Sequence, residues 1–357
     1  MKKAVVIIPA LNPEERLIQY CEQLIASGVD TILVVDDGSE DVYRSIFDKI
    51  ETIPECTVLR HDINMGKGRA LKDAFGYCLG KYSADEVSGV ITADSDGQHS
   101  VKDVIGIKEM LDYDQSGIIL GARDFDSENV PSKSSFGNKL TRFWFKILYG
   151  AKITDTQTGL RAIPINLLER FHNIRGERFE YETNMLVVAI NEKIPINEIK
   201  IETLYENQNE GTHFRPVKDS LSVLRILLST FLKFSLASLS SFLVDIILFR
   251  LILLFAFSFE TGLKITVATV VARVASSIYN YLVNKNVVFQ DNSKGSRTFI
   301  AYFTLAVIQM FCSAGLVYAI FSIWPVSETG IKILVDTLLF LISYRIQKAY
   351  IFKDKQS

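Results

Sequence analysis

The sequence predicts an α/β domain followed by an all-α membrane domain of four helices. In the first 214 residues, short apolar runs alternate with helical stretches, which is typical of a mostly parallel sheet covered on both faces. The two parts also differ in net charge. Residues 1–214, the head, carry 24 Lys/Arg and 34 Asp/Glu, whereas the remaining residues, the tail, carry 15 Lys/Arg and 7 Asp/Glu. The acidic excess argues against a nucleic-acid partner for the head, and the sparse basic residues of the tail favour a membrane surface.

The predicted strands of the head are short apolar runs at residues 4–8, 31–35, 56–59, 87–93 and 117–120. After the first strand, Asn12 is expected to be the N-cap of a helix whose first position is Pro13. In parallel sheets, ligands bind outside the carboxyl ends of the strands. That edge is therefore the predicted binding edge.

Asp94 and Asp96 directly follow the fourth predicted strand, so two carboxylates stand at its C-terminal tip, one residue apart. Hard divalent cations that also hold a substrate diphosphate need only one or two protein carboxylates. A strand-end turn is the alternative reading of an isolated Asp-x-Asp triplet. The neighbouring motifs favour the metal site.

Six short motifs follow these strands in order along the head. They are Pro9-Ala10-Leu11-Asn12, Asp36-Asp37-Gly38-Ser39, Asn64-x-Gly66-Lys67-Gly68, Asp94-x-Asp96-x-Gln98-His99, Gly121-Ala122-Arg123 and Asp155-x-Gln157-x-Gly159-x-Arg161. Together they resemble family 2 glycosyltransferases of the dolichyl-phosphate-mannose synthase type, over residues 1 to about 215. No Gly-x-Gly-x-x-Gly follows the first strand, and Gly66-Lys67-Gly68-Arg69 is not a Walker sequence. The resemblance implies a GT-A catalytic domain, Rossmann-like, at residues 1–214.

The resemblance also implies a nucleotide-sugar donor of the UDP-glucose or GDP-mannose class, with its diphosphate bridged by Mg²⁺ or Mn²⁺. The implied metal ligands are Asp96 and Asp94, with Gln98 as a further polar contact. Loss of the nucleoside diphosphate would then leave oxocarbenium character at the sugar C1.

Other motif residues imply contacts to the rest of the donor. Asp36 and Asp37 would accept hydrogen bonds from base and ribose, and Lys67 would face the phosphates. The backbones of Gly66 and Gly68 would face the phosphates too, although a tight turn is their alternative role. Further implied donor contacts are Pro9, Asn12 and Glu14.

The implied acceptor is a polyprenyl phosphate, undecaprenyl phosphate in a bacterium, which needs cationic positioning because its phosphomonoester is already largely ionised at neutral pH. Arg123 is the first candidate for the acceptor phosphate, followed by Arg161 and Arg215. Asp155 and Glu182 would orient sugar hydroxyls or these arginines, with a solvated helix start as the alternative for Glu182. The catalytic set implied is Asp94, Asp96, Arg123 and Asp155. Relatives often carry arginine where this chain has Lys133 and Ser135.

Two departures from the family pattern limit these expectations. Relatives commonly read Pro-x-Tyr-Asn-Glu near the first strand, but here Leu11 replaces Tyr and Pro13 separates Asn12 from Glu14. The Gln-x-x-Arg-Trp signature of processive members is absent, because the only head tryptophan is Trp144. One sugar per acceptor is therefore expected, rather than a polymer.

The four apolar stretches of the tail cover residues 234–257, 263–283, 299–322 and 331–350, each near the ~20 residues that a membrane-spanning helix needs. The connector after the second stretch and the C-terminus carry Lys and Arg, whereas the loops at 259–262 and 324–330 carry none. The positive-inside rule then places the head, the middle connector and the C-terminus in the cytoplasm. A multi-pass protein of the cell inner (plasma) membrane is expected, without a cleavable signal peptide.

Residues 215–233 link the two parts and mix basic with aliphatic side chains. They predict an amphipathic segment along the lipid headgroups, or simply a basic flank that orients the first span. Four cysteines without pairing or metal-like spacing fit a reduced compartment.

The tail at residues 234–357 contains an internal repeat. Residues 280–289 match residues 343–352, with Tyr, Lys, an amide side chain and an aliphatic-Phe pair coinciding. This resembles the GtrA-like four-helix membrane family. That family is associated with moving polyprenyl-linked sugars across membranes or with anchoring the synthases that make them. With the repeats aligned, Arg273 falls opposite Asp336, so an intramembrane ion pair is expected, with Asp245 as the competing partner of Arg273.

Three functions are compatible with these features. The first is a membrane-bound inverting transferase that makes a polyprenyl-phosphate monosaccharide. The second is a flippase of lipid-linked sugar with a regulatory or donor head. The third is a transferase to a protein or glycan hydroxyl with a passive anchor. A homo-oligomer is compatible with all three.

Overall fold

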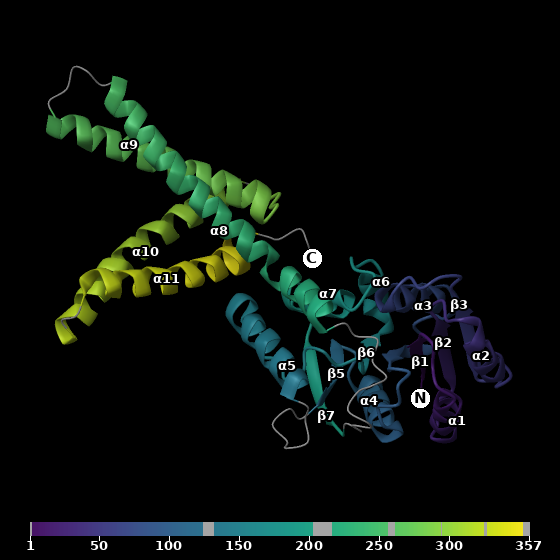
Figure 1. Ribbon diagram of the computed structural model, residues 1–357. Helices are drawn as coiled ribbons and strands as arrows, with labels where there is room; N and C mark the ends of the chain where they lie inside the picture. Colours follow the sequence, from purple (N-terminus) through teal and green to yellow (C-terminus); the bar gives the residue numbers. More distant parts are fainter. Residues whose placement is uncertain are drawn as a thin grey trace. The chain divides into compact units, whose positions relative to one another are not determined.

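The computed structural model describes residues 2–123, 132–202, 216–255, 261–293, 295–324 and 327–352 (Figure 1). Contacts divide the chain into two compact units, Met1–Ile226 and Leu227–Ser357. The first unit is a mixed α/β domain and the second is helical, so the expected fold class is confirmed.

The first unit is built on one seven-stranded sheet with the order β3-β2-β1-β4-β6-β5-β7. The strands are β1 (Lys3–Ala10), β2 (Thr31–Asp36), β3 (Cys56–Arg60), β4 (Val87–Thr92), β5 (Ile118–Arg123), β6 (Arg161–Pro164) and β7 (Ile196–Ile201). All neighbours are parallel except β6, which runs antiparallel to both β4 and β5. The five expected strands and the mostly parallel sheet are confirmed, and β6 and β7 are additional.

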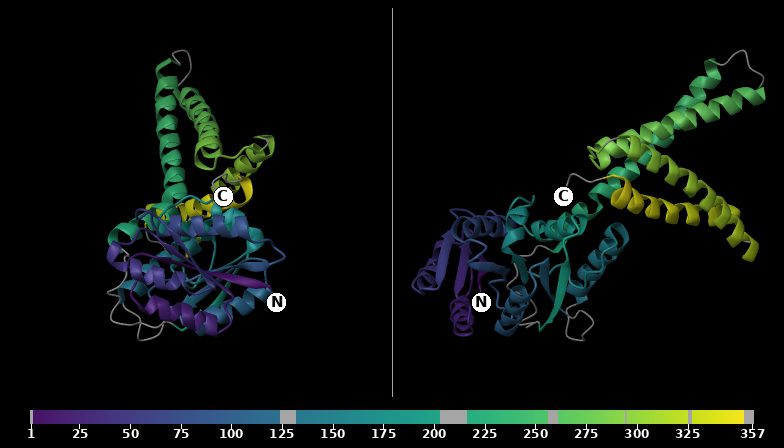
Figure 2. Two further views of the ribbon diagram at one scale, coloured as in Figure 1. Left: turned by 90° about the vertical axis from the view of Figure 1, so that its right-hand side faces the viewer. Right: turned by 180° about the vertical axis from the view of Figure 1, so that it is seen from behind.

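Helices cover both faces of this sheet, and the left view of Figure 2 shows the strands between them. On one face, α1 (Arg16–Ala26), α2 (Arg44–Glu51) and α4 (Val101–Tyr113) pack their apolar sides into one core with the strands, where α2 contacts β3 and α4 contacts β4, β5 and β6. On the other face lie α3 (Lys67–Lys81), α6 (Ile165–His172) and α7 (Glu180–Asn191). The strands are therefore buried on both sides, which explains why they read as continuous apolar runs. The remaining helix of this domain is α5 (Ser132–Trp144), followed by the π-helical η2 (Phe145–Tyr149).

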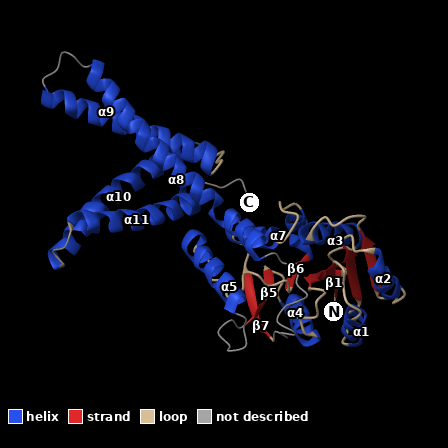
Figure 3. Cartoon of the chain, in the orientation of Figure 1, coloured by secondary structure: helices blue, strands red, loops and turns tan. Residues whose placement is uncertain are grey.

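All the regular elements described in the second unit are helices (Figure 3). The helix α8 (Pro216–Phe255) enters it and is followed by α9 (Thr261–Val283), α10 (Gly295–Ile323) and α11 (Glu328–Ile346). Short π-helical segments extend two of them, η4 (Asn284–Val288) after α9 and η5 (Gln347–Ile351) after α11. Among the described residues, two helical spans, Val223–Leu254 and Gly295–Ile323, are long and apolar enough to cross a membrane. Over the described residues, the four expected apolar stretches fall on α8, on α9, on α10, and on α11 with η5, and residues 216–233 form the first part of α8 without a break.

Equivalent positions of the internal repeat touch each other in the helical unit. Asn284 of η4 donates from Nδ2 to Oε1 of Gln347 in η5 at 3.3 Å, and these residues are 63 positions apart. The rings of Phe289 and Phe352, separated by the same interval, stack at a centroid distance of 5.1 Å and an interplanar angle of 16°. Contact between equivalent positions is the signature of a twofold axis.

Reciprocal contacts flank that axis. Tyr281 packs on Phe352 at 6.0 Å, and its counterpart Tyr344 packs on Phe289 at 6.3 Å between ring centroids. The hairpin α8–α9–η4 and the hairpin α10–α11–η5 are therefore related by an approximate twofold rotation, which confirms the repeat.

The expected ion pair between Arg273 and Asp336 is wrong for the described residues. Instead, Arg273 of α9 lies 3.6 Å from Asp245 of α8, counting from Nη2 to Oδ2. Asp336 of α11 accepts from Ser313 Oγ of α10 at 2.5 Å and from Lys332 Nζ at 2.8 Å. Each charge is paired inside its own hairpin because these positions face the preceding helix, whereas the axis runs through the ends formed by η4 and η5.

Candidate active site

Lys67 connects two of the sequence motifs and helix α7 at the carboxyl edge of the sheet. This residue begins α3, and its Nζ lies 2.6 Å from Oδ1 of Asp94, after β4, and 3.1 Å from Oε1 of Glu182 in α7. The second oxygen of Asp94 contacts Nε2 of His99 at 3.2 Å. The lysine side chain is 16% exposed and that of Glu182 is 9% exposed, so this network is largely shielded from water.

The charges of this network set the ionisation of its members. Burial works to lower the pKa of Lys67, but the attraction of Asp94 and Glu182 outweighs burial and raises it. Burial works to raise the pKa of Asp94, but Lys67 and His99 together hold it well below its usual range. Both groups are therefore charged at neutral pH.

Asp96 is in the opposite electrostatic situation. Its Oδ1 accepts from the backbone N–H of Gln98 at 3.1 Å, across a turn in which Gly97 has a φ of 73°. Burial and then the neighbouring charge of Asp94 raise the pKa of Asp96. A negative charge at this position is therefore disfavoured unless a cation compensates it.

This donor set fits a divalent cation that also binds a diphosphate. Among the described residues, no group of three or more His, Cys, Asp or Glu is placed to hold a metal ion. A cation shared with a diphosphate needs only one or two protein carboxylates, and Asp96 beside Asp94 supplies them. Bound there, Mg²⁺ or Mn²⁺ would act as a Lewis acid that neutralises the departing diphosphate.

The segment between Asp155 and Arg161 connects the two sides of the site. Asp155 is fully buried and binds Arg123 in a bidentate manner, with Nε at 2.6 Å and Nη2 at 3.1 Å from its two oxygens. At Gly159 the backbone passes so close to Asp94 that a Cβ atom would lie 2.3 Å from its Oδ2. A side chain at this position would therefore displace the carboxylate.

Arg161 lies under the site rather than in it. It is 1% exposed, and its guanidinium donates to the carbonyl oxygens of Thr158 at 2.9 Å and Glu182 at 2.6 Å. Burial lowers its pKa. A buried guanidinium that binds backbone carbonyls supports the site from below, so this arginine is less suited to an acceptor phosphate than the partly exposed Arg123.

The two aspartates after β2 organise the loops around the expected nucleotide position. Asp37 is 4% exposed and accepts from the backbone N–H groups of Met65 at 2.9 Å and Gly66 at 2.8 Å. Its Oδ1 also lies 2.9 Å from Nδ1 of His61. Asp36 accepts from the backbone N–H of Ser39 at 2.9 Å. Asp37 thus holds the loop that delivers Lys67.

Asn12 has a different role from the expected N-cap. It adopts the left-handed conformation with a φ of 50°, and its Oδ1 accepts from the backbone N–H of Glu40 at 2.9 Å. Its own N–H donates to Oγ of Ser39 at 2.9 Å. The helix α1 consequently begins at Arg16, four residues later, and the N-cap prediction is wrong.

The other expected site residues fall into three groups. Glu14 is exposed and pairs with Arg16 at 3.2 Å, and Pro9 lies within β1 beside Val35 of β2. Gly66 and Gly68 pack closely on the backbone of residues 177 and 178, so a tight approach to that segment is their structural role. Arg215 and the side chains of Lys133 and Ser135 lie outside the described residues.

Two histidines at this edge were given no role from the sequence, although one of them, His99, belongs to a motif. His99 contacts Asp94, and His61 bridges Asp37 and Asp73, with Nε2 lying 3.2 Å from the latter. Each follows a strand or a strand-end motif, which is the signal that places a polar side chain at the carboxyl edge of a parallel sheet.

Comparison with protein families matches both parts of the chain. Residues 5–172 match the family Glycosyl transferase family 2, and residues 227–352 match the GtrA/DPMS transmembrane domain. The chain is 30% identical to a UDP-N-acetylglucosamine–dolichyl-phosphate N-acetylglucosaminyltransferase of Methanococcus voltae, covering 56% of this chain and 84% of that protein. It is 26% identical to a dolichyl-phosphate beta-glucosyltransferase of Homo sapiens, covering 56% of this chain and 67% of that protein.

A similar solved structure is glucosyl-3-phosphoglycerate synthase from Mycobacterium tuberculosis, crystallised with Mn²⁺, UDP and phosphoglyceric acid. It has a TM-score of 0.47 and 18% identity, covering 64% of this chain and 78% of that one. Two findings establish the family of this chain. They are the matches to the family models and the 30% identity to the Methanococcus voltae enzyme, of which the chain covers 84%. The site at the carboxyl edge of the sheet agrees with them. The chain is a glycosyltransferase that belongs to Glycosyl transferase family 2 and carries a GtrA/DPMS transmembrane domain after its catalytic domain.

Proposed function

We propose that this glycosyltransferase transfers one sugar from a nucleotide-sugar donor to a polyprenyl phosphate and inverts the anomeric carbon. The observation that carries the proposal is the convergence of Lys67 and Asp94, from two separate motifs, with Glu182 of α7 into one charged network at the carboxyl edge of the sheet. Similarity to dolichyl-phosphate glycosyltransferases supports a lipid phosphate as the acceptor.

The charges at the site suit an acceptor that is already ionised. Asp94 and Glu182 are bound to Lys67, and Asp155 is bound to Arg123, so each of these carboxylates already contacts a cation rather than facing a substrate hydroxyl. A phosphate oxygen of the acceptor attacks C1 of the sugar as the bond from C1 to the nucleoside diphosphate breaks. Because the attacking oxygen carries no proton, no general base is required.

The proposed roles follow from these placements. Arg123, 16% exposed and oriented by Asp155, binds the acceptor phosphate. Asp96 and Asp94 hold the divalent cation, with Gln98 next to them. Lys67 keeps Asp94 ionised and oriented and supplies positive charge near the donor phosphates. Attack from the face opposite the leaving group yields a β-linked product from an α-linked donor.

The proposed organisation assigns residues 1–214 to catalysis, 215–233 to the membrane interface and 234–357 to four membrane helices. The basic residues near the middle connector and the C-terminus support a cytoplasmic location for these ends and for the catalytic domain. The inner (plasma) membrane of a bacterium and undecaprenyl phosphate are the corresponding proposals for membrane and carrier.

The test is product identity. Purified full-length protein is incubated with Mg²⁺, undecaprenyl phosphate and each of a panel of labelled UDP- and GDP-sugars, starting with UDP-glucose and UDP-N-acetylglucosamine. One donor should place label in the organic phase as a lipid bearing a single sugar, identified by mass spectrometry. Arg123→Gln should reduce this transfer at least 100-fold, whereas the surface variant Arg170→Gln, which changes a residue of α6 that pairs with Glu192 after the end of α7, should not. Label that stays in the aqueous phase with every donor, or lipid with several sugars, would contradict the proposal.

A further inference from the structure

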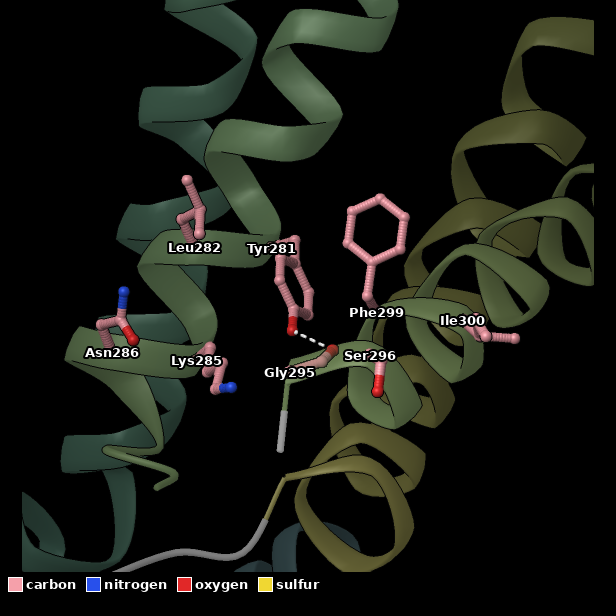
Figure 4. Close-up of a pocket in the computed structure, with 8 residues that line it drawn as sticks. All are labelled: Tyr281, Leu282, Lys285, Asn286, Gly295, Ser296, Phe299 and Ile300. Atoms are coloured by element: carbon pink, nitrogen blue, oxygen red, sulfur yellow. Dashed lines mark hydrogen bonds between the residues drawn. The ribbon is translucent and has the colours of Figure 1, made fainter. Parts of the chain in front are cut away.

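The helical unit contains a pocket of about 530 Å³ between the end of α9 and the start of α10 (Figure 4). One wall is formed by α9 and η4, and the other by the first turn of α10. Its lining residues are Tyr281, Leu282, Lys285, Asn286, Gly295, Ser296, Phe299 and Ile300. The catalytic proposal uses none of these residues.

Lys285 supplies a positive charge to this pocket. Its Nζ donates to the backbone carbonyl of Ser293 at 2.9 Å, and no carboxylate of the described residues lies within 4.0 Å of it. The nearby acid, Asp291, is buried and accepts from the backbone N–H of Ser293 at 2.9 Å and from its hydroxyl at 2.6 Å. Asp291 therefore shapes the turn, and the lysine charge has no acidic partner there.

The wall opposite Lys285 is held in place by a buried tyrosine. Tyr281 is 4% exposed, and its hydroxyl lies 2.9 Å from the carbonyl of Gly295 and 2.8 Å from Oγ1 of Thr298. A Cβ atom at Gly295 would lie 3.3 Å from Nζ of Lys285. The absence of a side chain at this position thus keeps the space beside the ammonium group open.

The rest of the pocket is apolar and exposed. Leu282, Phe299 and Ile300 are 47%, 40% and 66% exposed, and Figure 4 shows the phenyl ring of Phe299 on the opposite wall from Lys285. The pocket therefore combines one uncompensated cation with apolar side chains, at the end of two helices of a transmembrane domain. That end of a span meets the lipid headgroups, where basic pockets between helices bind anionic lipids.

We propose that this pocket binds an anionic phospholipid of the surrounding membrane. The phosphate of the headgroup pairs with the ammonium of Lys285, and the hydroxyl of Ser296 lies on the facing wall. The first acyl carbons run along Leu282 and Ile300.

The test uses full-length protein in nanodiscs of phosphatidylcholine with 20% phosphatidylglycerol, followed by release into detergent and native mass spectrometry. The wild-type protein should retain one phosphatidylglycerol. Lys285→Gln should lower the retained fraction at least fivefold, and Lys285→Arg should restore most of it. Arg297→Gln is the matched control, because Arg297 is an exposed cation of the same connector but does not line the pocket.

A second variant tests the pocket without changing its charge. Gly295→Leu fills the space beside Lys285 and should also lower retention at least fivefold, with circular dichroism confirming that the helices are intact. Equal losses in Lys285→Gln and Arg297→Gln would show diffuse attraction and overturn the site. So would retention in Gly295→Leu equal to that of the wild type. Displacement of the lipid by millimolar inorganic phosphate would assign the pocket to free phosphate and equally overturn the proposal.

Discussion

Replacing Gly159 with alanine tests whether the position of Asp94 governs catalysis. The added Cβ would lie 2.3 Å from Oδ2 of Asp94 and 2.6 Å from its Cγ, whereas real Cβ atoms essentially never approach closer than 3.0 Å. Asp94 or the backbone must therefore move by at least 0.7 Å. Gly159 is not one of the described glycines with a positive φ. Alanine at this position therefore acts through the close contact alone and not through backbone strain.

The expected magnitude follows from that displacement. A shift approaching 1 Å at a catalytic group costs about 100-fold in rate. Moving the carboxylate would also weaken its bonds to Lys67 and His99, which adds to the loss. The affinity for the nucleotide base should change little, because Asp37 holds the loop at Met65 and Gly66 through hydrogen bonds that do not involve Asp94 or Gly159.

The assay compares turnover of Gly159→Ala with that of two matched glycine variants. Gly80→Ala and Gly106→Ala lie on α3 and α4, where a Cβ would meet nothing within 4 Å, so both should keep wild-type transfer. Transfer to the lipid phosphate is measured by organic extraction, and UDP or GDP binding by calorimetry. If Gly159→Ala matches these controls in turnover, Asp94 is not position-sensitive and the proposed cation site is wrong.

Three further outcomes are expected. Lys67→Met should destabilise the catalytic domain by about 3 kcal/mol because it removes the ammonium group from the buried Glu182 and leaves Asp94 with His99 as its partner, and adding Glu182→Gln should recover part of that loss in a double-mutant cycle. The pKa of Asp94 is depressed in the folded protein, so ionised Asp94 stabilises the fold fully above the ordinary carboxyl pKa, and this stabilisation is lost as the pH falls toward the folded pKa. The difference in melting temperature between wild type and Lys67→Met should therefore be largest at pH 7 and should shrink below about pH 4. Asp96→Asn should raise the melting temperature in EDTA, because the repulsion between Asp96 and Asp94 disappears. The same variant should reduce turnover about 100-fold or more and show no thermal shift on addition of Mg²⁺. Unchanged turnover would refute the proposed role of Asp96.

Strand positions in the catalytic domain were predictable because strands buried on both faces read as apolar runs. Thr31–Asp36 and Val87–Thr92 illustrate this, with polar residues following at the carboxyl edge. By contrast, β6 has only four residues, begins with the motif residue Arg161, and runs antiparallel. Its membership in the sheet depends on tertiary pairing that local pattern does not encode.

That the motif residues lie at the carboxyl edge of the sheet was predictable, but the contacts between them were not. A motif states that Lys67 and Asp94 are present, but not that one ammonium group bridges Asp94 and Glu182. The burial of Arg161 was equally hidden, because an arginine in a motif reads as a ligand contact whether it faces solvent or the protein interior. Distances between segments far apart in sequence come only from the fold.

The twofold relation of the helical hairpins has a consequence for how such a domain originates and diverges. At the axis, Asn284 meets Gln347 and Phe289 meets Phe352, so either hairpin already carries both halves of the contact. A gene encoding a single hairpin would therefore specify its own partner as a homodimer. Once two copies are joined in one chain, the two hairpins no longer need to have the same sequence. One hairpin can then hold an arginine–aspartate pair and the other a lysine–aspartate pair.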